Sequence, residues 1–264
     1  MRKQIYYIAT AITIVFIISY GIIASLRMGK ENISQLKSIN MSDRIVPHNI
    51  NTLSNFDQIY NTGSRSFELD VHFRENEGGY FEVGHDSDNM TGVSLKTFLE
   101  SIPNEQINKI WLDIKNCSSS NINQIRFHLQ NLDALFHFKQ KLIVETSYIG
   151  SEIKELSCDG FHTSYYLPTN TILDLIIKED YQQMEALAIQ ISLQTEKQKL
   201  KACSFHIELY PFVKEHLENH ISDNLVYHCW DLSLKIKDWH FIDNLKSKVY
   251  YQDTRLKTIL IRFK

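Results

Sequence analysis

The first hydrophobic pattern along the chain is an apolar run without a charged residue, from Ile5 to Leu26. As a helix this run is roughly 30 Å long, the thickness of a bilayer hydrocarbon core. A buried core helix rarely lacks charge over such a length. A cleaved signal peptide has a shorter apolar core of about 7–15 residues and ends at a small-x-small site, which Ala24-Ser25-Leu26 matches poorly. We therefore predict an uncleaved transmembrane signal anchor over residues 5–26.

The orientation of this anchor follows from the basic residues on its two sides. Arg2, Lys3 and the terminal amine precede it, whereas Arg27 and Lys30 follow it together with an opposing Glu31. The slight basic excess before the run places residues 1–4 in the cytoplasm by the positive-inside rule. We expect a single-pass membrane protein whose remaining chain is extracytoplasmic.

A polar stretch and one large domain follow the anchor. Residues 31–44 are polar and aperiodic, which predicts a linker over residues 27–43. About 220 residues then run without a Pro/Gly-rich break, a length that suits one barrel-sized domain over residues 44–264.

Within this domain, short alternating segments predict β-strands. The clearest is Ser66–Phe73, where apolar residues at 67, 69, 71 and 73 alternate with polar ones, and Gly78-Gly79 and a return strand at Tyr80–Val83 follow it. The other predicted strands are Arg44–Val46, Lys109–Lys115, Lys141–Thr146, Asp159–Ser164, Cys203–Glu208, Leu225–Asp231 and Lys248–Gln252.

Helical spacing separates many of these strands. Predicted helices include Leu53–Tyr60, Leu95–Ile102, Ile122–Phe138, Thr171–Ile177 and Phe212–His220. Strands that alternate with helices favour βαβ units and a parallel sheet. Without the return strand there are eight strand candidates, which predicts an α/β fold, a (β/α)₈ TIM barrel preceded by one transmembrane helix.

Composition narrows the class of protein. The chain is 43% hydrophobic, enough for a packed core, and its 28 Lys+Arg against 31 Asp+Glu give a net charge of -3. This balance argues against a nucleic-acid partner. Four cysteines without CxxC spacing are read as free thiols (Cys117, Cys158, Cys203, Cys229). The chain also contains no GxSxG, P-loop, GxGxxG or HExxH motif.

Ionisable residues concentrate at the predicted carboxyl ends of the strands, where TIM barrels carry their active sites. Glu68 and Asp70 are two apart on one strand, so both point the same way with about 7 Å between their α-carbons. Two such carboxylates repel each other unless a cation or proton intervenes, which favours one divalent cation, Mg²⁺ or Ca²⁺, with Asp113 as a third ligand. The alternative is a solvated face of an edge strand.

The order of four short motifs adds a family resemblance. PHNINTL, FELDVHF, EVGHD and WLDIK, within residues 44–116, resemble the glycerophosphodiester phosphodiesterase family and its phosphatidylinositol phospholipase C-like barrel superfamily. The chain departs from the family pattern in having His48-Asn49-Ile50 in place of His-Arg-Gly and Asp113 in place of the commoner Glu. The short His-x-x-Asn motif and the Leu-Asp-x-Lys strand look more like the menorin-type offshoot of this superfamily.

The resemblance implies a role for each matching residue. His48 and His85 would be the catalytic acid/base pair, and Lys115 would contact the phosphate. The resemblance also implies that Glu68, Asp70 and Asp113 bind the metal. A later match, VYHCWDL, is similar to a Trp-containing family strand and would place Trp230 near the mouth.

Two further residues are candidates on their strand positions alone. Glu145 ends a predicted strand and is a candidate for lining the barrel mouth, as a substrate-binding residue. His72 shares a strand face with Asp70 and either supports the metal site or lies partly exposed on the strand.

These observations lead to two functional hypotheses. The first is a membrane-anchored, metal-dependent phosphodiesterase, a phosphoric diester hydrolase. Its substrates would be glycerophosphodiesters, phospholipid head groups or a related envelope polymer, and its place would be in lipid metabolism. The second is a catalytically degenerate barrel that binds a lipid or glycan head group without turnover. We prefer catalysis because every candidate acid/base and ligand position keeps a competent side chain.

Overall fold

The computed structural model describes residues 2–75, 78–88 and 90–263, with side chains described from residue 10 onward. Its centre is a nine-stranded sheet in the order β1-β9-β8-β7-β6-β5-β4-β2-β3. The strands are β1 (Ile45–His48), β2 (Ser66–Arg74), β3 (Tyr80–Val83), β4 (Lys109–Ile114), β5 (Leu142–Thr146), β6 (His162–Tyr166), β7 (Ala202–His206), β8 (Val226–Lys235) and β9 (Leu256–Arg262).

The sheet curls into a barrel. Neighbouring strands are parallel throughout the order, except that β3 pairs antiparallel with β2 as a hairpin. The two ends of the curl meet where the Ile50 N–H, just after β1, donates to the Glu68 carbonyl of β2 at 3.0 Å. The predicted α/β barrel is therefore confirmed.

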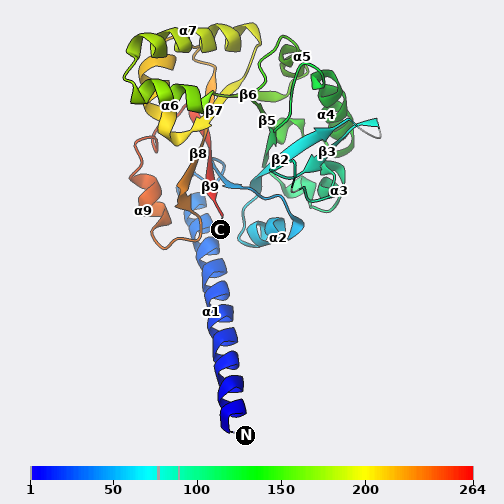
Figure 1. Cartoon of the computed structure of the whole chain (residues 1–264), viewed down its shortest axis with the longest axis vertical. Helices are drawn as coiled ribbons and strands as arrows, with labels where there is room; N and C mark the ends of the chain where they lie inside the picture. Colours follow the sequence, from blue (N-terminus) through cyan, green and yellow to red (C-terminus); the bar gives the residue numbers. More distant parts are fainter. Residues whose placement is uncertain (1, 76–77, 89, 264) are drawn as a thin grey trace.

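Helices surround the strands (Figure 1). They are α2 (Leu53–Asn61), α3 (Leu95–Glu100), α4 (Ile122–Phe136), α5 (Ile153–Cys158), α6 (Thr169–Ile177), α7 (Tyr181–Lys197), α8 (Tyr210–Phe212, continued by a π-helical turn, Val213–Leu217) and α9 (Phe241–Lys246). Short 3-10 turns lie at Asn104–Gln106, Lys139–Lys141 and Ile207–Leu209.

Strand alternation divides the buried side chains into two layers. Phe67, Leu69 and Val71 of β2 belong to the large core between the sheet and the helices, where the Phe67 ring lies 5.3 Å from the ring of Phe56 in α2. Glu68 and Asp70 alternate with them and therefore face the inside of the barrel. A separate small apolar cluster packs inside the barrel, formed by Val46, Trp111, Ile143 and Leu260.

The helix α1 (Arg2–Ser38) projects from the domain as a stalk (Figure 1). Its span from Thr10 is long and apolar enough to cross a membrane, by length and composition. The residues from 10 to 23 are exposed, including large apolar side chains such as Phe16 and Ile17.

The last turns of α1 are part of the domain, which corrects the expected linker over 27–43. The helix continues to Ser38, and Met28, Ile33 and Leu36 are buried against the barrel. The buried Asn32 amide donates to the Ile236 and Asp238 carbonyls at 2.7 and 2.8 Å. The stretch is polar in sequence because only one narrow face of the helix makes these contacts, so the apolar part of α1 joins the domain through a continuous helix.

Other helices and strands differ from the sequence prediction where contacts with distant segments outweigh the local hydrophobic pattern. The expected strand Lys248–Gln252 is a turn, and the eighth parallel strand is β9. Tyr250 of this turn is buried in the hydrophobic core, where its hydroxyl donates to Asp231 Oδ2 at 2.5 Å. The helices α5, α7 and α9 were not among those predicted. The helix α7 was missed because most of its residues are polar and only a narrow stripe is buried, formed by Met184, Ala188, Ile191 and Thr195.

Candidate active site

The register of the parallel strands brings the ionisable residues to one end of the barrel. Asp70 of β2 is paired with Asp113 of β4, and Asp113 is paired with Glu145 of β5. On the other side of the barrel, His48 of β1 is paired with Arg262 of β9. These positions lie at or near the carboxyl ends of their strands, where TIM barrels carry their chemistry.

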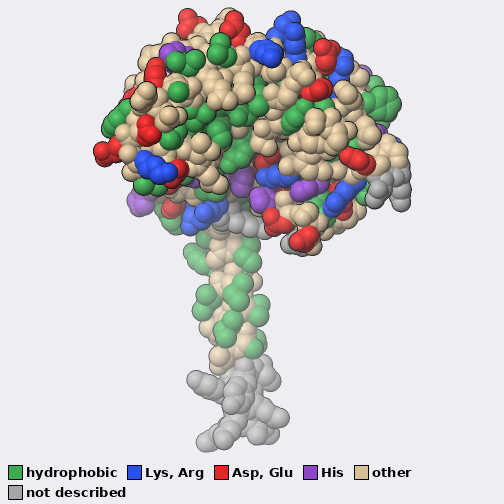
Figure 2. Space-filling model, turned by 45° about the horizontal axis from the view of Figure 1, so that its top comes forward, with side chains coloured by type: hydrophobic (Ala, Val, Ile, Leu, Met, Phe, Trp, Pro, Cys, Tyr) green, Lys and Arg blue, Asp and Glu red, His purple; other side chains and the backbone are tan. Residues whose placement is uncertain are grey.

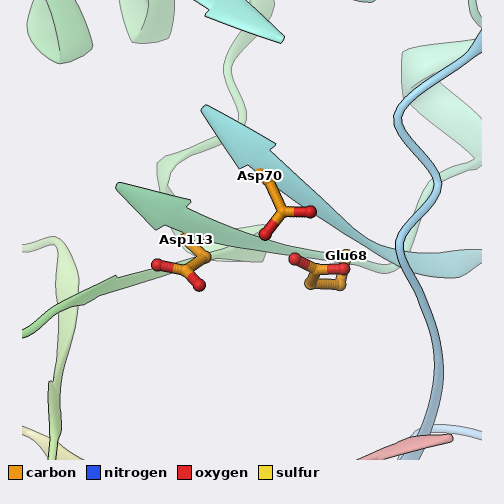
Figure 3. Close-up of side chains that lie close together, drawn as sticks. All are labelled: Glu68, Asp70 and Asp113. Atoms are coloured by element: carbon orange, nitrogen blue, oxygen red, sulfur yellow. The ribbon is translucent and has the colours of Figure 1, made fainter. Parts of the chain in front are cut away.

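Three carboxylates converge at this end (Figure 3). Glu68, Asp70 and Asp113 each offer an oxygen, and these atoms all lie within 4.8 Å of one another. Glu68 and Asp70 are buried, at 1% and 0% exposure, whereas Asp113 is partly exposed. Oxygen donors of this kind fit a hard divalent cation such as Mg²⁺ or Ca²⁺.

Two asparagines after β1 hold the carboxylates in place. The Asn51 amide donates to Asp70 Oδ2 at 2.7 Å, and its carbonyl oxygen accepts from the Asp70 N–H at 2.9 Å. The backbone N–H of Asn49 donates to Glu68 Oε2 at 2.5 Å, from a residue with φ of 61°. Asparagine tolerates this left-handed conformation better than most residues. The sequence motif contained both asparagines, but their contacts depend on the fold.

Lys115 compensates part of the negative charge. Its ammonium lies 2.8 Å from Asp70 Oδ1 and 2.5 Å from Asp113 Oδ2. Three carboxylates against one ammonium leave two negative charges, which is the charge that one divalent cation balances. The donor set therefore fits the cation that the sequence predicted.

Burial and mutual repulsion shift the pKa values of these groups. Burial, followed by the charge of Asp70, raises the pKa of Glu68 well above its ordinary value. Burial also raises the pKa of Asp113. For Asp70 burial acts in the same direction, but the Lys115 ammonium and the Asn51 hydrogen bond outweigh it and lower the pKa. Without a cation, the cluster therefore favours a proton on one carboxyl.

The two candidate histidines line the same cavity as members of this cluster. His48 Nε2 is 3.8 Å from Glu68 Oε2, and burial lowers the pKa of His48. His85 follows β3 and is 51% exposed, with Nδ1 hydrogen-bonded to Asp86 Oδ1 at 2.7 Å. The ring of His72 bonds the His85 carbonyl oxygen at 3.0 Å, so His72 fixes the backbone that carries His85.

A cavity of about 230 Å³ joins these groups, and we call it the catalytic cavity. Its lining contains seven of the eight predicted site residues, namely His48, Glu68, His85, Asp113, Lys115, Glu145 and Trp230. The eighth, Asp70, is completely buried beside it and contacts Lys115. The predicted residues thus come together at one place.

The structure adds residues that sequence reasoning missed. Tyr166 lines the catalytic cavity, and its ring makes an edge contact with Trp230 at 5.0 Å. The expected strand ended at Ser164, two residues before Tyr166, so Tyr166 was not considered as a residue at a strand end. Leu232 and Leu260 complete the lining from β8 and β9.

Glu145 lies at the buried side of the catalytic cavity, with 3% exposure. Its Oε2 accepts from the Trp111 indole N–H at 3.0 Å, whereas Oε1 is buried without a well-aligned hydrogen bond. Burial, reinforced by Asp113, raises the pKa of Glu145 to about 8. A carboxyl in this state is neutral near pH 7.

Comparison with known proteins supports the fold but gives no match in sequence. No protein-family model and no curated protein matches the chain. A solved glycerophosphodiester phosphodiesterase from Parabacteroides distasonis is similar, with a TM-score of 0.57 and 10% identity. The match covers 83% of this chain and 92% of that one.

Two further solved structures named for the same activity are also similar. The one from Silicibacter pomeroyi has a TM-score of 0.53 and 12% identity, over 83% of this chain and 89% of its own. The one from Galdieria sulphuraria has a TM-score of 0.51 and 14% identity, over 83% and 92%. The resemblance predicted from the motifs is thus confirmed at the level of the fold. The menorin-type offshoot is not among these structures and stays a prediction.

Proposed function

We propose that the chain is a membrane-anchored, metal-dependent phosphodiesterase that hydrolyses a glycerophosphodiester or a related phospholipid-type phosphodiester. The observation that carries this proposal is that two histidines and one lysine line a single cavity, at which a cluster of three carboxylates also lies. The similarity of the barrel to solved glycerophosphodiester phosphodiesterases supports the reaction class.

Glu68, Asp70 and Asp113 would hold the divalent cation. When bound, such a cation neutralises phosphate charge and lowers the pKa of a bound hydroxyl or water. Lys115 would add a positive charge against the non-bridging oxygens of the phosphate.

The two histidines divide the proton transfers. Because burial lowers its pKa, His48 is neutral near pH 7 and suits the acceptance of a proton from the attacking nucleophile. His85 has Nδ1 engaged by Asp86, which leaves Nε2 free to protonate the leaving alkoxide. Trp230 and Tyr166 offer an aromatic wall for the alcohol part of the substrate.

The test is hydrolysis of a phosphodiester panel by the full chain in detergent micelles. We expect turnover with added Mg²⁺ or Ca²⁺, its loss with a chelator, and a fall of about 10²-fold or more for either His48→Ala or His85→Ala. His240→Ala, an exposed histidine outside the cavity, is the matched control and should keep wild-type rates.

Full activity after both histidines are replaced would refute the proposal. Cation binding measured by calorimetry gives an independent readout, and Asp113→Asn should weaken it. Substrate binding without turnover under any cation would instead establish the degenerate barrel.

A further inference from the structure

Two further hollows lie between the catalytic cavity and α1. The catalytic cavity shares His48 and Leu232 with a second cavity of about 260 Å³, which Arg262 and Phe263 also line. Phe263 in turn lines a third and larger hollow of about 820 Å³ between the domain and α1. We call this third hollow the α1 groove. Their shared lining residues place the three hollows next to one another between the histidines and the stalk.

The barrel end that carries the site faces the stalk. The carboxyl end of β9 reaches the base of the domain beside α1, and α2 lies at the same base (Figure 1). Figure 2 shows Lys, Arg and His side chains, with some Asp and Glu side chains among them, along the lower part of the domain just above the stalk. A membrane crossed by α1 would therefore lie opposite the mouth of the catalytic cavity.

One wall of the α1 groove is apolar. It is formed by one face of the helix, where Ile18, Gly21 and Ile22 recur at helical spacing. Ile18 and Ile22 are more than half exposed, and no atom lies within 4 Å of a Cβ built at Gly21. This wall falls within the uncharged run that ends at Leu26. In a membrane crossed by α1, it would therefore lie at the depth of the lipid acyl chains.

The opposite wall is cationic and belongs to the domain. Lys235 and Lys237 line it beside one acidic residue, Asp238, so its net charge is positive, and the Lys237 ammonium lies over the Phe263 ring at 4.1 Å. Within the described part of the chain, Lys235 and Arg262 form no ion pair. Positive charge above an apolar wall is the arrangement that a phospholipid fits, with its phosphate against the lysines and a chain along the helix.

The loop beside the groove gives a second sign that this face meets a membrane. Trp239 follows Lys237 and Asp238 and is 76% exposed. The same loop is tied to α1 by the Asn32 amide, which holds it at the level where the apolar run has just ended. Tryptophan is enriched at the membrane–water boundary because its ring is amphipathic.

We infer that the substrate is a phosphodiester lipid of the membrane that α1 crosses, reached through the α1 groove without leaving the bilayer. Its chain packs along Ile18, Gly21 and Ile22, and its phosphodiester passes Phe263 into the catalytic cavity. This inference rests on the proposed function. In the reaction, the oxygen of water bonds to phosphorus and the bond from phosphorus to the alcohol oxygen breaks. His48 takes one proton of the water, and His85 donates a proton to the leaving alkoxide oxygen, which departs as the alcohol.

The experiment fills the groove. The full chain in phosphatidylcholine vesicles is supplied with phosphatidylglycerol in the same bilayer or with soluble glycerophosphoglycerol. Gly21→Trp places a large side chain in the groove, whereas Ile23→Trp places it at a nearby exposed position that does not line the groove. We expect Gly21→Trp to lower the ratio of lipid to soluble hydrolysis about tenfold or more, equivalent to the loss of about 1.4 kcal/mol. The control should keep the wild-type ratio.

Photocrosslinking tests lipid binding in the α1 groove independently of hydrolysis. Phosphatidylglycerol with a photoreactive acyl chain should label α1 in the His48→Ala variant with a chelator present, and Gly21→Trp should suppress this labelling. An unchanged rate ratio with unchanged labelling would overturn the inference, as would a wild-type chain that hydrolyses only the soluble diester. Labelling at the groove without hydrolysis of either substrate would instead overturn the proposed phosphodiesterase.

Discussion

Replacing Glu145 by glutamine removes a buried carboxyl that makes the stability of the barrel depend on pH. Glu145 is 3% exposed, and burial raises its pKa from 4.5 to about 8. Glutamine keeps a carbonyl oxygen for the Trp111 indole N–H, which now donates to Glu145 Oε2. The substitution therefore removes the ionisation and retains the shape and one hydrogen bond.

The direction in which stability changes with pH follows from proton binding in the folded and unfolded states. Between pH 4.5 and 8 the folded chain holds a proton on Glu145 that the unfolded chain has released, so stability falls as pH rises. Each pH unit in this window costs about 1.4 kcal/mol. Between pH 5 and pH 7 the Glu145→Gln variant should gain about 3 kcal/mol in free energy of unfolding relative to the wild type.

The assay is urea unfolding of the full chain in detergent micelles, followed by tryptophan fluorescence at several pH values. A chelator is present so that no cation binds the neighbouring carboxylates. Glu105→Gln, at an exposed position, controls for the loss of one negative charge. A difference between variant and wild type that stays constant from pH 5 to pH 7 would show that Glu145 is ionised in the folded chain, and the burial argument would be refuted.

Two further predictions concern the packing of α1 and the support of the metal ligands. Leu36→Ala should lower the free energy of unfolding by about 2–5 kcal/mol because Leu36 is fully buried against the barrel. Lys37→Ala, an exposed neighbour, should change it little, and equal small effects in the same unfolding assay would show that this part of α1 is only a spacer. Asn51→Ala should weaken divalent-cation binding about tenfold or more in calorimetry, since two hydrogen bonds hold Asp70. Wild-type affinity in Asn51→Ala, with Asn61→Ala as the exposed control, would contradict this role.

Local pattern predicted most of the barrel because each strand signals itself over a few residues. The alternation in Ser66–Phe73 predicted β2, and the return strand at Tyr80–Val83 has the predicted bounds. The last strand was missed because the aromatic stretch before it has the composition of a strand, whereas Tyr250 packs in the core from a turn, with its hydroxyl bonded to Asp231. The difference between a buried turn and a buried strand depends on the partner, which lies far away in the sequence.

The sequence predicted the candidate site residues that lie near the ends of predicted strands or within the four motifs. Every predicted residue lines the catalytic cavity or lies beside it. This is expected because residue type and approximate position along a strand can both be read from the sequence. Tyr166 lay beyond the expected strand end, and Arg262 lay on the strand that was missed. Neither carries a motif of its own, so only their position in the barrel identifies them.

The sequence by itself determined the apolar helix, the alternation of strands and helices, and the chemical types of side chain at the strand ends. Each of these depends on neighbours within a few residues and on the fixed periods of helix and strand. Only the tertiary structure decided how the site is supported and where it faces. The register of β2 and β4 sets Asp70 beside Asp113, and the packing of Leu36 on the barrel turns an expected linker into a continuous helix. Such contacts join segments far apart in the chain, and their energy comes from burial that no local pattern encodes.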